Sequence, residues 1–202
     1  MEIAMDKFVI TVSRQFGSMG RSIAHSLSER LQIPFYDRDI VEETAKRMQL
    51  PLSLVSDTEE TSGSVYFKRQ YPLGMGISSM QDEIFLIQKN IIEDLAAKES
   101  CIIVGRCADS ILHSMKNRLS VFVFAPYESR YDNCIHHLGM DASTAEKMIR
   151  SVDRSRQLYH KRYCENYKDE YSNKDLMLNS SSFGIEGSAA VLETVIRDRF
   201  MQ

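Results

Sequence analysis

The stretch FVITVSRQFGSMGRSIA at residues 8–24 indicates the class of fold. Its first six residues form a β-branched run that predicts a short strand, and a glycine-containing loop follows at 14–20. The next residues change to helical spacing, with Ile23, Leu27 and Leu31 on one face. A strand, a loop of this kind and a helix in this order predict a ligand-binding edge, because parallel α/β sheets bind ligands beyond the carboxyl ends of their strands.

The loop itself has the composition of a phosphate-binding loop. Glycines let backbone N–H groups turn inward, and the positive end of the following helix adds to their attraction for an anion. Arg21 and Ser22 occupy the places of Lys and Ser/Thr in the pattern GxxxxGK[ST], although Gln15 stands at the first glycine. The order of elements favours a phosphate-binding loop over a plain strand–helix connection, which stays the alternative. The candidate phosphate-binding residues are Gly17, Ser18, Met19, Gly20, Arg21 and Ser22.

The rest of the chain alternates between apolar runs and helical patterns. Further strands are predicted at 34–36, 101–105, 119–124 and 175–178. Helices are predicted at 38–48, 81–98, 107–115, 127–138, 142–163 and 185–200. Residues 50–80 carry several Pro and Gly residues and predict a movable insertion rather than core. The alternation predicts an α/β fold around a mostly parallel sheet.

Length and charge limit the class of ligand. The chain has 202 residues and a mass of 23.2 kDa, which fits one domain over residues 1–202. A formal net charge of −3 argues against a general nucleic-acid binder, which needs a basic surface to neutralise phosphates. Residues 147–162, however, hold six Lys or Arg and one acid, a local balance of +5. We therefore expect an anionic small molecule, and no nucleic acid, as the ligand.

The cysteines and the N-terminal residues indicate the compartment. The spacings between cysteines contain no CxxC or Cys/His zinc pattern, so no structural metal is expected. The N-terminal residues show no signal peptide, which favours reduced thiols in a cytoplasmic protein. No apolar run approaches the roughly 18 residues of a membrane span, so no membrane partner is expected. The four cysteines are Cys101, Cys107, Cys134 and Cys164.

Four stretches resemble the cytidylate kinase-like family, a branch of the P-loop nucleoside monophosphate kinases. They are ITVSRQFGSMGRSIA at 10–24, IPFYDRDIV at 33–41, CIIVGRCAD at 101–109, and DRSRQLYHKRY with DLMLNSS within 153–181. The resemblance implies a three-layer P-loop kinase fold with a mostly parallel sheet, a monophosphate-binding insertion at about 50–80 and a helical lid at about 150–173. It also implies phosphoryl transfer from ATP, with Mg²⁺, to cytidylate (CMP or dCMP). Met19 departs from the family, in which a glycine is usual.

Two strand ends carry candidate substrate-binding residues. Asp37 follows the second strand and would bind Mg²⁺ through water or hold the substrate's sugar, while a helix N-cap is the alternative. Arg106 follows the apolar run at 101–105, and its planar fork suits bidentate phosphate binding. The resemblance implies that Arg106 grips the monophosphate, with Asp109 one helical turn further on. An ion pair between these two residues is the alternative.

The basic helix separates into two faces at 100° per residue. One stripe of cations is expected to face solvent: Lys147, Arg150, Arg154 and Lys161. Arg156 projects instead from the apolar face, between Val152 and Tyr159, where a cation is costly without a partner. Arg156 is therefore the first candidate for a lid arginine that stabilises the transferring group, with snorkelling around a packed edge as the alternative. The secondary candidates are Arg154 and Arg162, with Asp153 as a positioning partner.

The remaining candidates complete the expected site. Arg130, in the helix after the 119–124 strand, supplies another phosphate contact or lies on the surface, and Arg14 is similarly placed. Arg21 is expected to act on the transferring phosphate, and Ser22 to hold Mg²⁺, with Asp37 through water. The alternative function is a nucleotide-binding regulator with weak or no catalysis, motivated by Met19 and the absence of a loop lysine. No sequence pattern indicates an oligomeric state.

Overall fold

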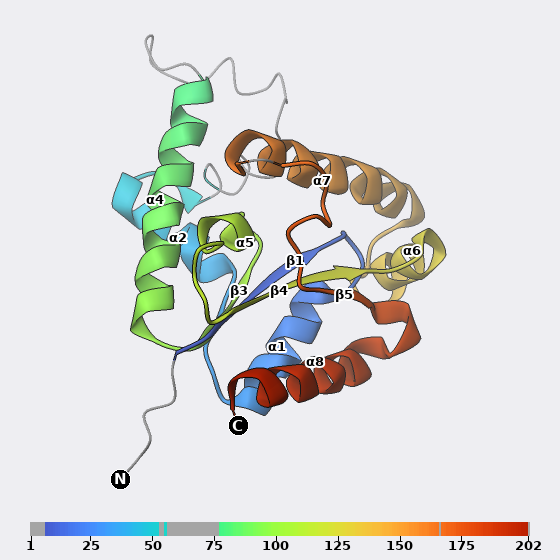
Figure 1. Cartoon of the computed structure of the whole chain (residues 1–202). Helices are drawn as coiled ribbons and strands as arrows, with labels where there is room; N and C mark the ends of the chain where they lie inside the picture. Colours follow the sequence, from blue (N-terminus) through green and yellow to red (C-terminus); the bar gives the residue numbers. More distant parts are fainter. Residues whose placement is uncertain (1–6, 53–54, 56–76, 166, 202) are drawn as a thin grey trace.

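The computed structural model describes residues 7–52, 55, 77–165 and 167–201 (Figure 1). The strands are β1 (Val9–Arg14), β2 (Phe35–Tyr36), β3 (Cys101–Val104), β4 (Arg118–Phe124) and β5 (Leu176–Asn179). The helices are α1 (Gly20–Leu31), α2 (Arg38–Met48), α4 (Ile77–Lys98), α5 (Ala108–Ile111), α6 (Tyr127–His136), α7 (Ala142–Tyr163), the 3₁₀ helix η2 (Ser180–Ser182) and α8 (Gly184–Phe200).

The five strands form one parallel sheet with the order β2-β3-β1-β4-β5. Strand β1 lies in the centre, where Val9 pairs with Cys101 of β3 on one side and with Arg118 of β4 on the other. All strands therefore end at the same edge of the sheet, its carboxyl edge. The residues that follow each strand lie together there. The predicted α/β fold around a parallel sheet is confirmed.

Helices cover both faces of this sheet. Alternate residues of a strand point to opposite faces, and Ile10 belongs to a core with α1 and α8, whereas Val9 belongs to a core with α4 and α5. Figure 1 shows α1 and α8 together below the sheet and α2, α4 and α5 on the other side. Burial on both faces explains why β1 and β3 are continuous apolar runs.

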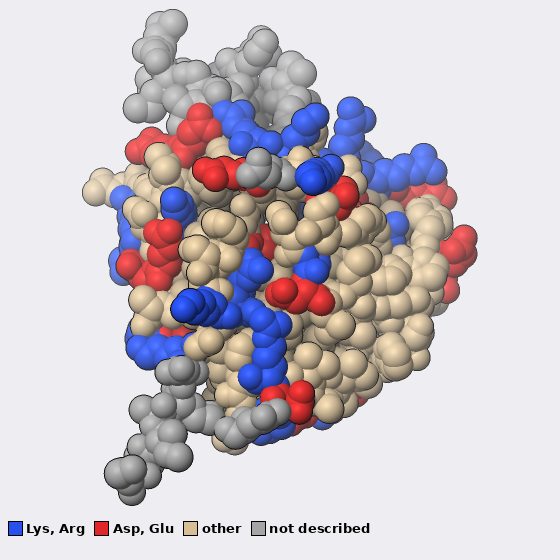
Figure 2. All heavy atoms as spheres, viewed as in Figure 1, with Lys and Arg blue, Asp and Glu red and all other residues tan. Residues whose placement is uncertain are grey.

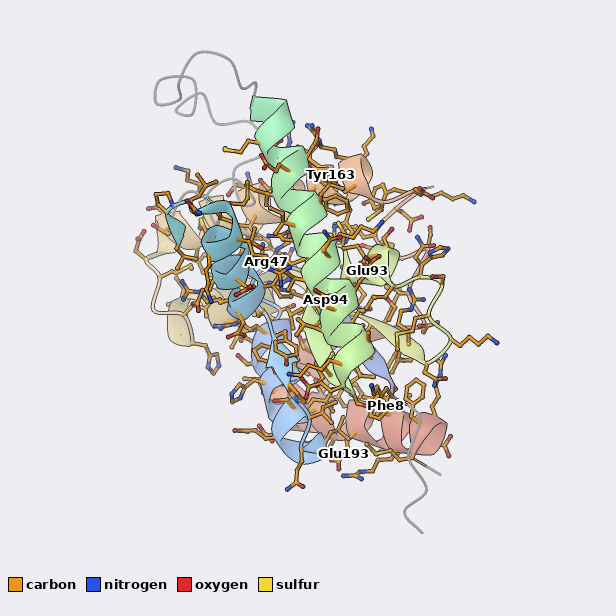
Figure 3. The ribbon with its side chains drawn as sticks, turned by 90° about the vertical axis from the view of Figure 1, so that its left-hand side faces the viewer. Phe8, Arg47, Glu93, Asp94, Tyr163 and Glu193 are labelled. Atoms are coloured by element: carbon orange, nitrogen blue, oxygen red, sulfur yellow. The ribbon has the colours of Figure 1, made fainter. Side chains whose placement is uncertain are left out.

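Helix α4 supports two neighbouring helices. In Figure 3 it runs beside α2, where the Arg47 guanidinium of α2 lies 4.0 Å from the Asp94 carboxylate of α4. The other neighbour is the C-terminal end of α7, where the Tyr163 ring stacks on Phe85 of α4 with centroids 4.2 Å apart. The Tyr163 hydroxyl also donates a hydrogen bond to Asp82 of α4 at 2.9 Å. These contacts hold α7 across the carboxyl edge of the sheet.

Two predicted helices differ from the structure by four residues at one end. Helix α4 begins at Ile77 rather than at residue 81, because Met80 extends its apolar face and packs in one cluster with Ile84 and Val41. Helix α5 begins one residue later than predicted, because Cys107 has a left-handed backbone that a helix cannot include, and it ends at Ile111 rather than at residue 115. The insertion predicted at 50–80 lies largely outside the described residues.

Candidate functional site

The loop between β1 and α1 turns through two left-handed residues. Gly17 has φ 76°, and a Cβ atom there would lie 2.7 Å from the carbonyl oxygen of Arg130, so only glycine fits without a shift. Met19 has φ 59° and is the N-cap of α1. A left-handed backbone is unfavourable for methionine, and such strain accumulates at functional sites. The loop thus returns tightly onto the N-terminus of α1.

Polar contacts from distant elements hold this loop in place. The Ser18 side chain is fully buried, and its hydroxyl lies 2.9 Å from the Gln15 carbonyl oxygen and 3.2 Å from that of Val123. Asn133 donates to the Gly17 carbonyl oxygen at 2.9 Å, and the Ser180 hydroxyl donates to that of Ser18 at 2.7 Å. The Ser18 hydroxyl therefore bonds to the protein interior.

A carboxylate of the protein itself accepts a hydrogen bond from one backbone N–H of the loop. Asp153 of α7 accepts a hydrogen bond from the Phe16 N–H at 2.7 Å. Arg130 of α6 donates to the other Asp153 oxygen at 2.5 Å and to the Phe16 carbonyl oxygen at 3.3 Å. Of the predicted residues, Asp153 and Arg130 therefore lie together at the loop. Their arrangement shows that this loop holds an oxyanion with its backbone.

Arg21 and Asp37 form an ion pair at the outer side of the site. The side chain of Arg21 is 56% exposed, and its Nε lies 2.6 Å from Asp37 Oδ2. Asp37 is buried at the N-cap of α2 without capping it by a side-chain hydrogen bond, and its Oδ1 lies 3.7 Å from Arg14 Nη2. The carboxylate predicted to serve Mg²⁺ is thus held by two arginines. Ser22 is the third residue of α1 and is partly exposed.

Arg14 crosses from the end of β1 toward β3. A Cβ atom at Gly20 would lie 2.7 Å from Arg14 Cβ, and a Cβ atom at Gly105 would collide with the Arg14 guanidinium. The two glycines therefore clear the path of this side chain. Gly20, the first residue of α1, packs against the Cβ and Cγ atoms of Arg14, and the guanidinium itself lies beside Gly105. Sequence analysis left the role of Arg14 open.

Arg106 lies in a strained turn after β3. Gly105, Arg106 and Cys107 have φ angles of 76°, 57° and 54°, three successive left-handed residues. Only the first is glycine, so the turn stores backbone strain of the kind found at ligand sites. Burial of the guanidinium, together with the neighbouring charge of Arg14, lowers the pKa of Arg106 to about 10. The side chain is still a cation at neutral pH, held close to a like charge.

Arg14 and Arg106 line a cavity of about 90 Å³ between the sheet edge and α7. Arg156 reaches it from α7 and donates to the Arg14 carbonyl oxygen at 3.0 Å. The cationic side chains at its wall are Arg14, Arg106, Arg156 and Lys174, and the acidic ones are Asp109, Asp169 and Glu170. The cavity therefore brings together three residues that sequence analysis singled out, Arg106, Asp109 and Arg156.

Lys174 neutralises Asp109 at this wall. The Lys174 ammonium contacts the Asp109 carboxylate and donates to the Ser13 hydroxyl at 3.1 Å. Burial raises the pKa of Asp109, but the neighbouring His160 and Lys174 outweigh it and hold that pKa well below its usual range. Lys174 is not among the residues predicted for the site, and its single signal in the sequence is its position just before the strand predicted at 175–178.

The other predicted arginines of α7 lie away from the cavity. Arg154 is exposed, and Arg162 pairs with Asp82 of α4 at 2.9 Å. The stripe of cations predicted to face solvent is exposed, and Figure 2 shows Lys and Arg side chains gathered along the upper edge over α7. Arg156 alone among these α7 arginines lines the cavity.

The parallel sheet, the glycine loop before α1 and the covering helix define the fold of the P-loop kinases, as expected from the sequence. The model of the cytidylate kinase-like family matches residues 9–182, and the chain belongs to this family. Membership of this kinase-like family supports a phosphotransferase, a class of enzyme that in general uses ATP and a metal ion.

Solved structures agree with this assignment. An uncharacterized protein from Eubacterium ventriosum ATCC 27560 is 26% identical with a TM-score of 0.72, over 96% of this chain and 100% of that one. Shikimate kinase from Acinetobacter baumannii is 10% identical with a TM-score of 0.55, over 96% of each chain. A gluconokinase from Sinorhizobium meliloti 1021 is 15% identical with a TM-score of 0.55, over 95% of this chain and 94% of that one. The last two show the fold alone.

The search of curated proteins found no match. Within the described part of the chain, no helix combines the length and the apolar character that crossing a membrane requires.

Proposed function

We propose that this protein transfers a phosphoryl group from ATP to a nucleoside monophosphate, with CMP or dCMP as the preferred acceptor. The observation that carries the proposal is the convergence of Arg14, Arg106 and Arg156 on one cavity at the carboxyl edge of β1 and β3. Phosphoryl transfer depends on positive charge around the reacting group far more than on covalent chemistry. The preference for cytidylate rests on the family alone.

The roles of the arginines follow from the elements that hold them. Arg106 stands on the rigid turn after β3 and binds the acceptor's phosphate with both arms of its guanidinium. Arg156 reaches the cavity from the covering helix and offsets the charge that develops on the transferring group. The volume of about 90 Å³ is below the 300–1,000 Å³ of ordinary ligand pockets. A nucleotide therefore enters when α7 moves outward.

The loop and its surroundings fit the phosphates of ATP. The Phe16 N–H donates a hydrogen bond to the Asp153 carboxylate, an oxyanion, and this contact supports a role for the loop backbone in binding phosphate. Bound ATP would supply the phosphoryl group, and Mg²⁺ would offset the charge of its phosphates. Among the predicted metal donors, Ser22 is partly exposed on α1, and Asp37 becomes available once Arg21 turns away. ATP and Mg²⁺ as the particular cofactors belong to this proposal.

A panel of acceptors tests the function. Purified protein is supplied with ATP and Mg²⁺ and with CMP, dCMP, UMP, AMP, shikimate or gluconate, and ADP release is followed by a coupled assay. The proposal expects the fastest turnover with CMP or dCMP and its loss in R156A. The matched control is R150A, an exposed arginine of the same helix, which keeps wild-type turnover. Unchanged turnover in R156A, or transfer to a sugar acid but not to CMP, contradicts the proposal.

A specific observation favours a second candidate, a nucleotide-binding regulator without catalysis. Asp153 accepts a hydrogen bond from the Phe16 N–H of the loop, and Arg21, which stands in the place of the loop lysine, is paired with Asp37. Both features weaken the site for triphosphate. Titration calorimetry beside the coupled assay separates the two functions, because tight nucleotide binding without turnover for every acceptor identifies the regulator.

A further inference from the structure

Three side chains with metal-ligand chemistry meet beside the cavity. Cys107 belongs to the left-handed turn after β3, His160 to the last turn of α7, and Cys164 is the C-cap of that helix. One ligand atom from each lies within 4.8 Å of the other two. Within the described residues this is the single group of three or more such side chains that meets the distance condition for holding an ion. Both thiols are buried, at 0% and 8% exposure.

The set of donors suits zinc. Two thiolates and an imidazole are common ligands of Zn²⁺, with Zn–S near 2.3 Å and Zn–N near 2.0–2.1 Å. In a tetrahedron with these bonds, ligand atoms lie about 3.3–3.8 Å from one another. The three ligand atoms lie at most 4.8 Å apart, so small side-chain movements would bring them to the distances that a bound ion requires. His160 and Cys164 are four residues apart, so one face of α7 presents both.

The orientation of His160 is that of a metal ligand. Its Nδ1 lies 3.0 Å from the carbonyl oxygen of Arg156, which is the contact that fixes the tautomer of ligating histidines and leaves Nε2 with the lone pair. Nε2 lies 3.5 Å from Asp109 Oδ1, and neither of these two buried atoms has a hydrogen-bond partner. Asp109 is 3% exposed. His160 Nε2 thus faces a carboxylate that Lys174 already neutralises, and a metal ion bound at Nε2 would lie beside that ion pair.

We propose that Cys107 Sγ, His160 Nε2 and Cys164 Sγ bind one Zn²⁺ ion, with the fourth position open toward the cavity wall at Asp109. Both thiols release their protons on binding. His160, Cys164 and Asp109 line the cavity itself, so the fourth position is within reach of a water molecule or a ligand oxygen there. The ion ties the turn that carries Arg106 to the end of α7 and fixes the covering helix over the sheet edge.

Cobalt spectroscopy tests the site independently of any kinase activity. The full chain is freed of metal with a chelator under reducing conditions and titrated with Co²⁺. The proposal expects thiolate-to-cobalt charge-transfer absorption and tetrahedral d–d bands that saturate at one ion per chain and disappear when Zn²⁺ is added. In C107S, C164S and H160Q these bands are lost or strongly weakened. The matched control is C134S, because Cys134 is a buried thiol of α6 outside the cluster and the variant keeps the bands.

A thermal melt of the same proteins shows that loss of metal is not loss of fold. Zn²⁺ raises the unfolding midpoint of the wild type and of C134S but not that of C164S, whose far-UV circular dichroism without metal matches the wild type. Two outcomes overturn the proposal: no cobalt bands in the fully reduced wild type, or bands that persist in both C107S and C164S.

Discussion

The loop after β1 and the cavity under α7 lie at the same edge of the sheet, but they are held in opposite ways. The loop is held by side chains of the protein itself. The Asp153 carboxylate accepts a hydrogen bond from the Phe16 N–H, and Arg130 donates to both Asp153 and the Phe16 carbonyl oxygen. The cavity wall holds several cations beside its acidic side chains, and burial together with the nearby Arg14 lowers the pKa of Arg106. One helix, α7, supplies Asp153 to the first region and Arg156 to the second. Rotation of this helix therefore affects both regions at once.

The largest expected effect belongs to the cavity. Replacing Arg106 by Ala removes two hydrogen bonds to a charged phosphate, and each such bond contributes about 1.5–3 kcal/mol. We expect CMP affinity to fall by at least about 10- to 150-fold, the equivalent of one of these bonds, by titration calorimetry. R106K, which keeps the charge but loses the fork, is expected to recover only part of it. Equal CMP affinity in wild type and R106A would show that the cavity does not bind the acceptor.

The next prediction tests whether the Arg14 side chain is held beside Gly105. Gly105→Ala adds a Cβ that collides with the Arg14 guanidinium, in addition to the strain of alanine at φ 76°. Gly139 is the control, because it has φ 67° and nothing within 4 Å, so G139A carries the strain alone, about 1–3 kcal/mol. We expect G105A to lower both the unfolding midpoint and CMP affinity more than G139A. Indistinguishable variants would mean that Arg14 is not held there.

In the loop, we expect a substitution to raise ligand affinity rather than to lower it. Asp153→Asn removes the negative charge from the Phe16 amide, and two unit charges about 4 Å apart in water interact by roughly 1 kcal/mol. ATP affinity should therefore rise about fivefold in D153N, measured by calorimetry. D132N removes an exposed acid of α6 as the control. Weaker ATP binding in D153N would make Asp153 a supporting residue of the loop rather than a competitor for it.

The smallest effect concerns the start of α7. Asp141 caps this helix by accepting from the Thr144 N–H at 3.0 Å, and hydrogen bonds from the Thr144 and Ser143 hydroxyls hold the pKa of its carboxyl well below the usual range. A lowered pKa in the folded state adds stability above the unfolded pKa, near 3.9, and that stability is lost as pH falls. D141A should slightly lower the thermal midpoint at pH 7, and the difference should shrink below about pH 4. A constant difference down to pH 2 would contradict this assignment.

Sequence patterns located part of the site because those parts follow from local rules. Arg106 ends an apolar run that had to be a buried strand, and Arg156 interrupts the apolar face of a helix. Both positions predict a side chain directed at the sheet edge, and both line the cavity. The resemblance added Asp109. These predictions needed only the period of a strand or helix and the rule that parallel strands end together.

Other residues of the site could not be found in this way. Lys174 meets Ser13 across 161 positions of sequence, and Cys107 meets Cys164 only because α7 folds back over the turn after β3. The sequence holds no CxxC pair and therefore predicted no metal, whereas the proposed ligands combine His160 and Cys164 of the end of α7 with Cys107 of the turn after β3. For Arg21 the sequence pattern was misleading in the opposite way. It occupies the motif position of the loop lysine, but its side chain does not line the cavity and is paired with Asp37.

Local sequence patterns are enough to establish the order of strands and helices and the two faces of the basic helix. These depend on interactions between residues at most a few turns apart. Only the tertiary structure decided which cations converge. The packing of Tyr163 and Phe85 sets where α7 crosses the sheet edge, and the missing side chains of Gly20 and Gly105 let Arg14 reach β3. Such placements depend on the shape of distant neighbours, which no local pattern contains.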